Sequence, residues 1–272
     1  MFQPIDKPQL MGILNVTPDS FSDGGKFTGV AAAIRQAEKM IAEGADIIDI
    51  GGESTRPGSE PVPADEQIRR VVPAIAAIKS INPNVKISID TTLSQVAAAA
   101  LDAGACIIND VSAGQGDSSM LAFAAKAQTP IILMHMQGTP KTMQNQPRYD
   151  DVLTEVIAAL QQRIGEALAA GVLPENIAID PGIGFGKRTQ DNIDLLAHLN
   201  RFVELGYPVL LGTSRKRFMG SICNVNQPDE LVTATAVTTA LGVMAGVQMF
   251  RVHDVQANRQ AADVAWAIKQ AQ

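Results

Sequence analysis

Eight short apolar runs in this sequence each end in polar residues of the kinds that bind ligands or carry out catalysis. The polar residues are Asn15, Glu53 to Arg56, Asp90, Asn109, His135, Asp180, Ser214 to Lys216, and Arg251 with His253. Structural turns alone would account for two or three such changes. Eight of them predict a ligand pocket, provided that the fold brings the ends of the runs together.

Arg251 and His253 stand two positions apart, so their side chains leave an extended strand on the same face. If the last run lies beside the first, Asn15 is close to both. The planar fork of an arginine matches phosphate oxygens, so this edge of the pocket suits a phosphate or diphosphate. The alternative is an arginine that reaches solvent and a histidine with an ordinary structural partner.

A second set of polar residues, Asp90, Asn109, Asp180 and Lys216, comes from four different runs. Carboxylates accept hydrogen bonds, an ammonium donates them and an amide does both, so together they can bind the edge of a flat heterocycle. Burying these charges without a ligand would require internal pairing at appreciable cost. The alternative is a structural Asp–Lys pair.

The apolar runs alternate with helical patterns, which predicts an α/β fold. The expected strands cover residues 9–15, 46–50, 85–89, 105–108, 130–134, 177–179, 208–211 and 248–252, and the expected helices lie near residues 30–41, 64–80, 94–102, 118–127, 153–164, 192–204, 228–245 and 254–269. Eight strands alternating with eight helices favour a (β/α)8 TIM barrel over a doubly wound open sheet. With no linker in between, residues 1–272 are expected to form a single domain. In such barrels the loops after the strands build the active site.

Composition excludes several classes of protein. The chain has 272 residues, with 28 acidic against 22 basic side chains and a net charge of -6, so it lacks the basic surface of a nucleic-acid-binding protein. It has no leader pattern and no apolar run of about 18 residues, from which we expect a cytoplasmic protein without a membrane partner. The two cysteines lack metal-site spacing. Cys106 is expected in the core and Cys223 in a loop.

With these motifs in order, the chain resembles the dihydropteroate synthase family over essentially its whole length. The segments that carry the resemblance are residues 11–25, 44–57, 180–187, 214–216 and 251–253. Two positions depart from the pattern of many members: Leu93 replaces a lysine and Arg217 replaces a serine. Neither belongs to the candidate site, so the departures concern loop detail and inhibitor response more than activity.

The resemblance implies condensation of a (7,8-dihydropterin-6-yl)methyl diphosphate with p-aminobenzoate in folate biosynthesis. It also implies that the enzyme is a homodimer and a target of sulfonamides. It implies pterin binding by Asp90, Asn109, Asp180 and Lys216, and diphosphate binding by Asn15, Arg251 and His253. Asn15 would also be a ligand of Mg²⁺. Asp90, Lys216, Arg251 and His253 would be catalytic.

Three further sets of residues follow from the same resemblance. Residues 19–21 and 55–57 would form two mobile loops, with Thr55 and Arg56 binding substrate, and Phe185 and Ser214 would lie near p-aminobenzoate. Two alternatives stay open: a pterin-dependent methyltransferase and a non-catalytic pterin-binding paralogue. A methyl donor brings no diphosphate for Arg251 and His253, and a paralogue would be expected to lack Asn15, Thr55 or Arg56.

Overall fold

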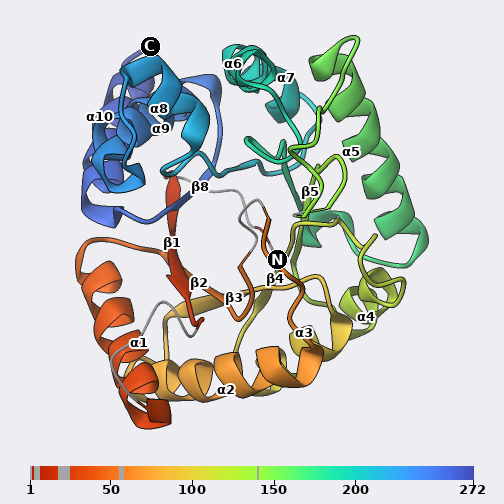
Figure 1. The fold of residues 1–272 in the computed structure, drawn as a ribbon, viewed down its shortest axis with the longest axis vertical. Helices are drawn as coiled ribbons and strands as arrows, with labels where there is room; N and C mark the ends of the chain where they lie inside the picture. Colours follow the sequence, from red (N-terminus) through yellow and green to blue (C-terminus); the bar gives the residue numbers. More distant parts are fainter. Residues whose placement is uncertain (1, 3–6, 18–24, 55–57, 140) are drawn as a thin grey trace.

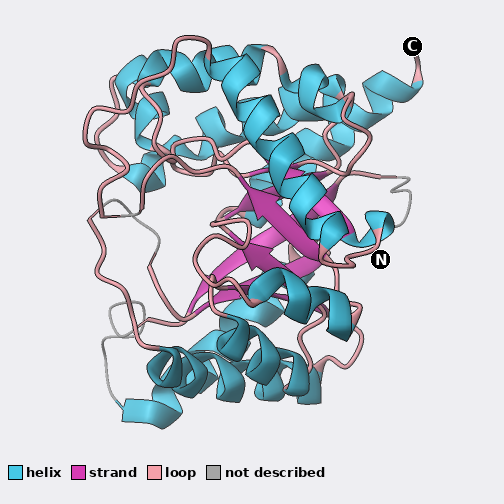
Figure 2. Cartoon of the chain, turned by 90° about the vertical axis from the view of Figure 1, so that its right-hand side faces the viewer, coloured by secondary structure: helices cyan, strands magenta, loops and turns pink. Residues whose placement is uncertain are grey.

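The structure is a computed structural model that describes residues 2, 7–17, 25–54, 58–139 and 141–272, with residues 25–28 described by their backbone alone. Viewed down its shortest axis, the molecule has its strands at the centre and a ring of helices around them (Figure 1). The perpendicular view shows the strand arrows crossing the middle of the molecule between helices (Figure 2).

All eight strands pair in parallel within one sheet. They are β1 (Gln9–Asn15), β2 (Ile47–Gly51), β3 (Lys86–Asp90), β4 (Ile107–Asp110), β5 (Ile131–Met134), β6 (Ile177–Asp180), β7 (Leu210–Leu211) and β8 (Met249–Val252). β1 pairs with both β2 and β8, and a single parallel bridge between Ile179 and Val209 joins β6 to the start of β7. The strands therefore close into the predicted TIM barrel.

Ten α-helices occur in the part of the chain that the structure describes. They are α1 (Gly25–Ala42), α2 (Ala64–Ile81), α3 (Ser94–Asp102), α4 (Met120–Ala127), α5 (Val152–Ala169), α6 (Thr189–Ala197), α7 (Leu199–Val203), α8 (Arg217–Cys223), α9 (Val232–Ala245) and α10 (Val255–Gln270). The helix α5 shows how the local sequence determines a helix. In α5, Val156, Leu160 and Ile164 recur at helical spacing and are buried, and the Asp151 side chain accepts from the backbone N–H groups of Leu153 and Thr154.

Two helix predictions were wrong in detail, and one helix was not predicted. The helix expected over residues 192–204 is two helices, because His198 Nδ1 lies 2.8 Å from the Asp194 carbonyl and the His198 N–H instead donates to Leu195. The helix expected from Pro228 begins as a 3₁₀ turn, Pro228–Leu231. Sequence analysis also missed α8, which buries Phe218 and Met219.

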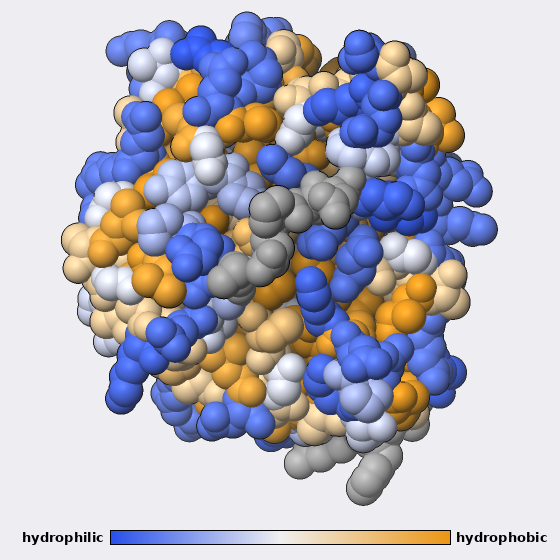
Figure 3. All heavy atoms as spheres, turned by 180° about the vertical axis from the view of Figure 1, so that it is seen from behind, coloured by the Kyte–Doolittle hydropathy of each residue, from blue (hydrophilic) through white to orange (hydrophobic). Residues whose placement is uncertain are grey.

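The two cysteines also differ from expectation. Cys106 is exposed rather than in the core, and Cys223 is the last residue of α8 rather than part of a loop. No helix in the described ranges is long and apolar enough to cross a membrane. On the face seen from behind, apolar and hydrophilic residues are interspersed (Figure 3).

The apolar interior has two parts because side chains alternate along each strand. The larger part fills the space between sheet and helices. The smaller part lies inside the barrel and forms an apolar floor from Met11, Ile47, Ile107, Ile132, Ala178, Leu210 and Met249. One pleat further along the same strands, the inward positions carry the candidate site.

Candidate active site

The inward positions above the apolar floor change from hydrophobic to largely polar. Two residues beyond the floor on the same strands stand Ile13, Asp49, Asn109, Met134, Asp180, Gly212 and Arg251. Three of the side chains, Asp49, Asn109 and Asp180, are at least nine-tenths buried. The barrel therefore holds an acidic and amide-rich layer at the carboxyl ends of its strands, where TIM barrels place their active sites.

Arg251 joins two carboxylates across the barrel. Its Nε donates to Asp49 Oδ2 and its Nη2 donates to Asp90 Oδ2, both at 2.6 Å. Burial opposes the charge on Arg251, but the two aspartates outweigh this effect and raise its pKa. Burial raises the pKa of Asp90 to about 7, although Arg251 acts in the opposite direction. Asp90 therefore titrates near neutral pH.

Asp180 and Lys216 form a second pair of opposite charges in the barrel, and each favours the charged form of the other. Burial raises the pKa of Asp180, which accepts a hydrogen bond from the Gly182 N–H at 2.6 Å. Burial lowers the pKa of Lys216 to about 8, with Asp180 opposing the change. Lys216 Nζ also lies 4.0 Å from the centre of the Phe185 ring. The structure thus brings together Asp180 and Lys216 of the predicted pterin set with Phe185, which the resemblance placed near p-aminobenzoate.

His253 lies one residue beyond β8, and its Nδ1 is 3.0 Å from Ser214 Oγ. The same hydroxyl accepts from the His253 backbone N–H at 3.1 Å. Arg251, in contrast, is directed at Asp49 and Asp90. The structure describes contacts for Nε and Nη2 of Arg251, and both nitrogens donate to carboxylates. An anion site shared by Arg251 and His253 therefore stays a prediction.

Asn15 ends β1, beside Gly51 and Asp90 in strand register. A Cβ atom at Gly51 would lie 3.7 Å from Asn15 Oδ1 and 3.5 Å from Asp90 Cβ. The glycine therefore leaves open the space between these two side chains. Thr55, Arg56 and the loop residues 19–21 and 57 lie outside the described residues.

Sequence analysis missed Lys187, which is only 3% exposed. Its Nζ donates to the carbonyls of Gly182 at 2.8 Å and Phe185 at 3.1 Å, and lies 3.0 Å from His135 Nδ1. Burial lowers the pKa of Lys187 to about 7 and that of His135 to about 3. This lysine ties the loop after β6 to the end of β5. In the sequence, Lys187 is marked only as the last residue of segment 180–187, one of the segments that carry the family resemblance.

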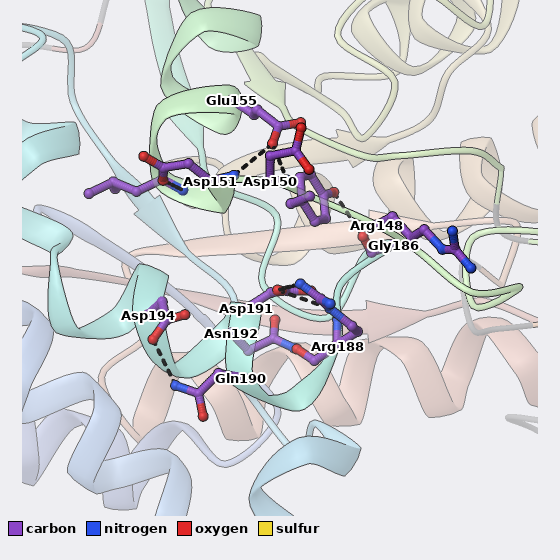
Figure 4. Close-up of polar contacts among 12 residues, drawn as sticks. Arg148, Asp150, Asp151, Glu155, Gly186, Arg188, Gln190, Asp191, Asn192 and Asp194 are labelled. Atoms are coloured by element: carbon purple, nitrogen blue, oxygen red, sulfur yellow. Dashed lines mark hydrogen bonds and ion pairs between the residues drawn. The ribbon is translucent and has the colours of Figure 1, made fainter.

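The far side of the same loop is also fixed. The Tyr149 hydroxyl donates to the Gly186 carbonyl at 2.8 Å, and Arg188 forms a bidentate pair with Asp191 at the start of α6 (Figure 4). Gly182 and Gly186 have φ values of +67° and +62°, and a Cβ at Gly182 would lie 1.8 Å from the His135 carbonyl oxygen. Only glycine permits this close approach, which places Phe185 over Lys216.

Sequence analysis also missed Asp49, which lies inside β2 rather than at its end. Asp49 is fully buried, and its Oδ2 accepts from Asn109 Nδ2 at 3.2 Å as well as from Arg251. The alternation of β2 could have identified it, because Ile47, Asp49 and Gly51 share the inward face. Asp49 thus connects two predicted site residues.

Known proteins resemble this chain over nearly its whole length. The family described as pterin binding enzyme matches residues 11–253. A dihydropteroate synthase from Synechocystis sp. is 47% identical over 259 residues, which cover 95% of this chain and 89% of the relative. One from Streptococcus pyogenes serotype M3 is 51% identical over 251 residues, which cover 92% of this chain and 91% of the relative.

Solved structures agree with these relatives. Xanthomonas albilineans dihydropteroate synthase with 4-aminobenzoic acid has a TM-score of 0.91 and 45% identity, covering 98% of this chain and 94% of that chain. The same organism's enzyme in complex with 7,8-dihydropteroate has a TM-score of 0.87 and 43% identity, covering 98% and 95%. With this fold, this polar layer and these relatives, the chain belongs to the dihydropteroate synthase family of pterin-binding enzymes, which are transferases of folate synthesis.

Proposed function

We propose that the polar layer of this barrel condenses a (7,8-dihydropterin-6-yl)methyl diphosphate with p-aminobenzoate, by a dissociative displacement at the methylene carbon. The family supplies the reaction, and the arrangement of this chain's residues supports their roles. The observation that carries the proposal is the position of Arg251 between Asp49 and Asp90, directly above the apolar floor. This position of Arg251 puts fixed charges of both signs inside the buried polar layer.

The pterin would lie flat above the floor, with its edge on Asp90, Asn109, Asp180 and Lys216. Three of these side chains are at least nine-tenths buried, so a ligand would replace water with fixed donors and acceptors. Phe185 and Ser214 would then lie at the outer side, towards p-aminobenzoate. The contact between Phe185 and Lys216 supports this placement, because it joins the two proposed subsites.

The diphosphate would lie at the β1 and β8 side, near Asn15, His253 and those N–H groups of Arg251 that donate to neither Asp49 nor Asp90. Among the described residues, no three His, Cys, Asp or Glu side chains are grouped to hold a metal ion. Mg²⁺, however, commonly keeps its waters and binds one protein oxygen together with substrate phosphates, which fits the Asn15 amide oxygen beside the space left by Gly51. When bound, Mg²⁺ would neutralise charge on the diphosphate.

In the displacement, the bond between the methylene carbon and the diphosphate oxygen breaks, and the oxygen keeps the electron pair. The pterin ring spreads the positive charge on the methylene, and the carboxylate of Asp90 would stabilise it further. The neutral aniline nitrogen of p-aminobenzoate then forms the new C–N bond and gives up a proton to the departing diphosphate or to water. Lys216 would donate to the pterin, and Arg251 with His253 would stabilise the charge on the leaving diphosphate.

Turnover tests this proposal directly. Diphosphate release from the pterin substrate in the presence of Mg²⁺ is measured with and without p-aminobenzoate, while dihydropteroate is followed separately. One diphosphate per dihydropteroate is expected. Pterin binding without turnover would overturn the proposal in favour of a non-catalytic pterin-binding paralogue.

We expect the substrates to bind in order, pterin diphosphate first. A cation at the methylene would react with water if the second subsite were open, so the p-aminobenzoate subsite should be completed only after the first substrate has bound. In calorimetry, p-aminobenzoate should bind to the enzyme that holds pterin and diphosphate and show no measurable binding to the free enzyme. Equal affinities in both titrations would contradict the predicted order.

We further propose that the chain forms a homodimer through α9 and α10. These packed helices expose Val237 and Leu241 on α9 and Val264 and Ile268 on α10, each at least 53% accessible. The residues in each pair are four positions apart, so each pair forms an apolar stripe on its helix. A two-fold axis would bury this surface against its own copy.

Sedimentation of a Leu241→Asp variant tests the dimer. The variant is expected to sediment as a monomer, because the substitution places charge within the buried surface. Ile81→Asp, on the exposed end of α2, is the matched control and should remain dimeric. A monomeric parent protein or a dimeric Leu241→Asp would contradict the proposal.

The cytoplasmic location expected from the sequence stays a prediction.

A further inference from the structure

Among the residues that the structure describes, Asp49 is the carboxylate of the polar layer with hydrogen bonds to two other proposed site residues. A single oxygen, Oδ2, accepts from Arg251 Nε at 2.6 Å and from Asn109 Nδ2 at 3.2 Å. Its side chain is fully buried, one pleat above Ile47 in the apolar floor. Asp49 therefore belongs to the same layer as Asn109, but it is fully buried and contacts Asn109 and Arg251.

Stability alone is a poor explanation for this residue. The other oxygen, Oδ1, is buried and has no hydrogen-bond partner in the described part of the chain. A buried carboxylate with an unsatisfied oxygen is costly. The equivalent layer positions on β1 and β5 carry Ile13 and Met134, so this depth of the barrel accepts apolar side chains. The cost of Asp49 indicates a role in the site.

The contacts of Asp49 determine what its neighbours can offer a ligand. The Asp49 Oδ2 that accepts from Arg251 also accepts from Asn109, so Asn109 turns its Nδ2 towards Asp49. The carbonyl oxygen Oδ1 of Asn109 is then left for the ligand. In the same way, Asp49 holds Nε of Arg251, which directs Nη2 at Asp90. Without Asp49, the amide of Asn109 could rotate by 180° and Arg251 would lose its second anchor.

We infer that Asp49 is a positioning residue that fixes the hydrogen-bonding pattern of the pterin pocket, with Asn109 as an acceptor and Arg251 directed at Asp90. This inference rests on the proposed assignment of Asn109 and Asp90 to the pterin pocket. Arg251, which is assigned to the diphosphate, enters it only through its contact with Asp90, and p-aminobenzoate is not involved.

An Asp49→Asn variant tests the inference because it keeps the shape and removes the acceptor-only character. Calorimetry with 6-hydroxymethylpterin, which carries no diphosphate, is expected to show binding about 10–100-fold weaker than in the parent protein. In turnover, the KM of the pterin substrate should rise while that of p-aminobenzoate is unchanged. Asp46→Asn is the matched control. Asp46 precedes the same strand and contacts Leu10 and Arg259, so pterin binding should be unaffected.

The same titration in Asn109→Ala and in the double variant separates positioning from general damage. Because Asp49 acts partly through Asn109, Asp49→Asn should weaken binding much less in the Asn109→Ala background than in the parent protein. Equal effects in both backgrounds, or unchanged pterin binding in Asp49→Asn, would overturn the inference. Unchanged binding in Asn109→Ala alone would instead overturn the pocket assignment. If Asp49→Asn does not fold, Asp49→Ser replaces it, with the same expected results.

Discussion

An Arg251→Lys variant is expected to lose about 10²–10³-fold in kcat/KM although it keeps its positive charge. Arg251 uses two nitrogens of its planar group at once, on Asp49 and Asp90. A lysine offers one point of donation and cannot reproduce this bridge. Charge on the departing diphosphate develops in the transition state, so the loss should appear in kcat as well as in kcat/KM.

The experiment measures steady-state diphosphate release over a range of pterin substrate concentrations with p-aminobenzoate saturating, alongside thermal unfolding. Arg259→Lys is the matched control, since Arg259 has a similarly shielded side chain and an ion pair with Asp263 but lies on α10. Lysine is preferred to alanine because Arg251→Ala would leave two buried carboxylates without a cation, which costs about 3–5 kcal/mol. A kcat/KM within a few-fold of the parent value would contradict the role of Arg251.

The fold could be predicted because a parallel strand buried on both faces leaves an apolar run, and because each run here ends at the polar mouth of the barrel. Strand ends were less predictable. The run over residues 208–211 yields only Leu210–Leu211 as β7, since Pro208 has no N–H to donate and the Val209 N–H donates to the side chain of Gln248. Hydrophobicity identifies a strand, whereas its limits depend on individual hydrogen bonds.

The site was predictable where its residues end strands and much less so elsewhere. Asp90, Asn109 and Asp180 follow apolar residues directly, so a change of residue type identifies them. Asp49 lies within an apolar run, and only its inward register separates it from a chance polar residue. Lys187 depends on the turns at Gly182 and Gly186, which fold the loop back over it. The contact of Lys187 with His135 joins residues that are distant in the sequence, and such a contact leaves no periodic pattern to detect.

The ion pairs of the polar layer were not predicted. Among the described residues they join Arg251 to Asp49 and Asp90, whereas the anion site of Arg251 and His253 stays a prediction. Residue types predicted which side chains share the pocket, but the partner of each depends on register across β2, β3 and β8.

An Asp90→Asn variant is expected to lose about 10²-fold in kcat/KM at about pH 8 and progressively less as the pH falls. Burial raises the pKa of Asp90 from 3.8 to about 7 against the pull of Arg251, and the nearby carboxylates of Asp49, Asp110 and Glu53 act in the same direction as burial. Above this pKa the parent enzyme has a carboxylate to stabilise the methylene cation. Below it the side chain is neutral, like the amide of the variant. The ratio of parent to variant rates should therefore rise with pH through about 7.

The other groups with shifted pKa values in the site, Asp180, Lys187 and Lys216, are present in both proteins, so the ratio reports the Asp90 charge together with its effect on the pKa of Lys216. A folding defect would lower the rate of the variant by a similar factor at every pH. Asp110→Asn is the matched control: burial also raises the pKa of Asp110, but its oxygens bind Ser112 and Gly114. Because the Asp110 charge contributes to the raised pKa of Asp90, this variant should shift its ratio to the parent only slightly around pH 7 and show no comparable rise with pH. A constant ratio for Asp90→Asn between about pH 5.5 and 8.5 would mean that the Asp90 charge does not act on the reaction.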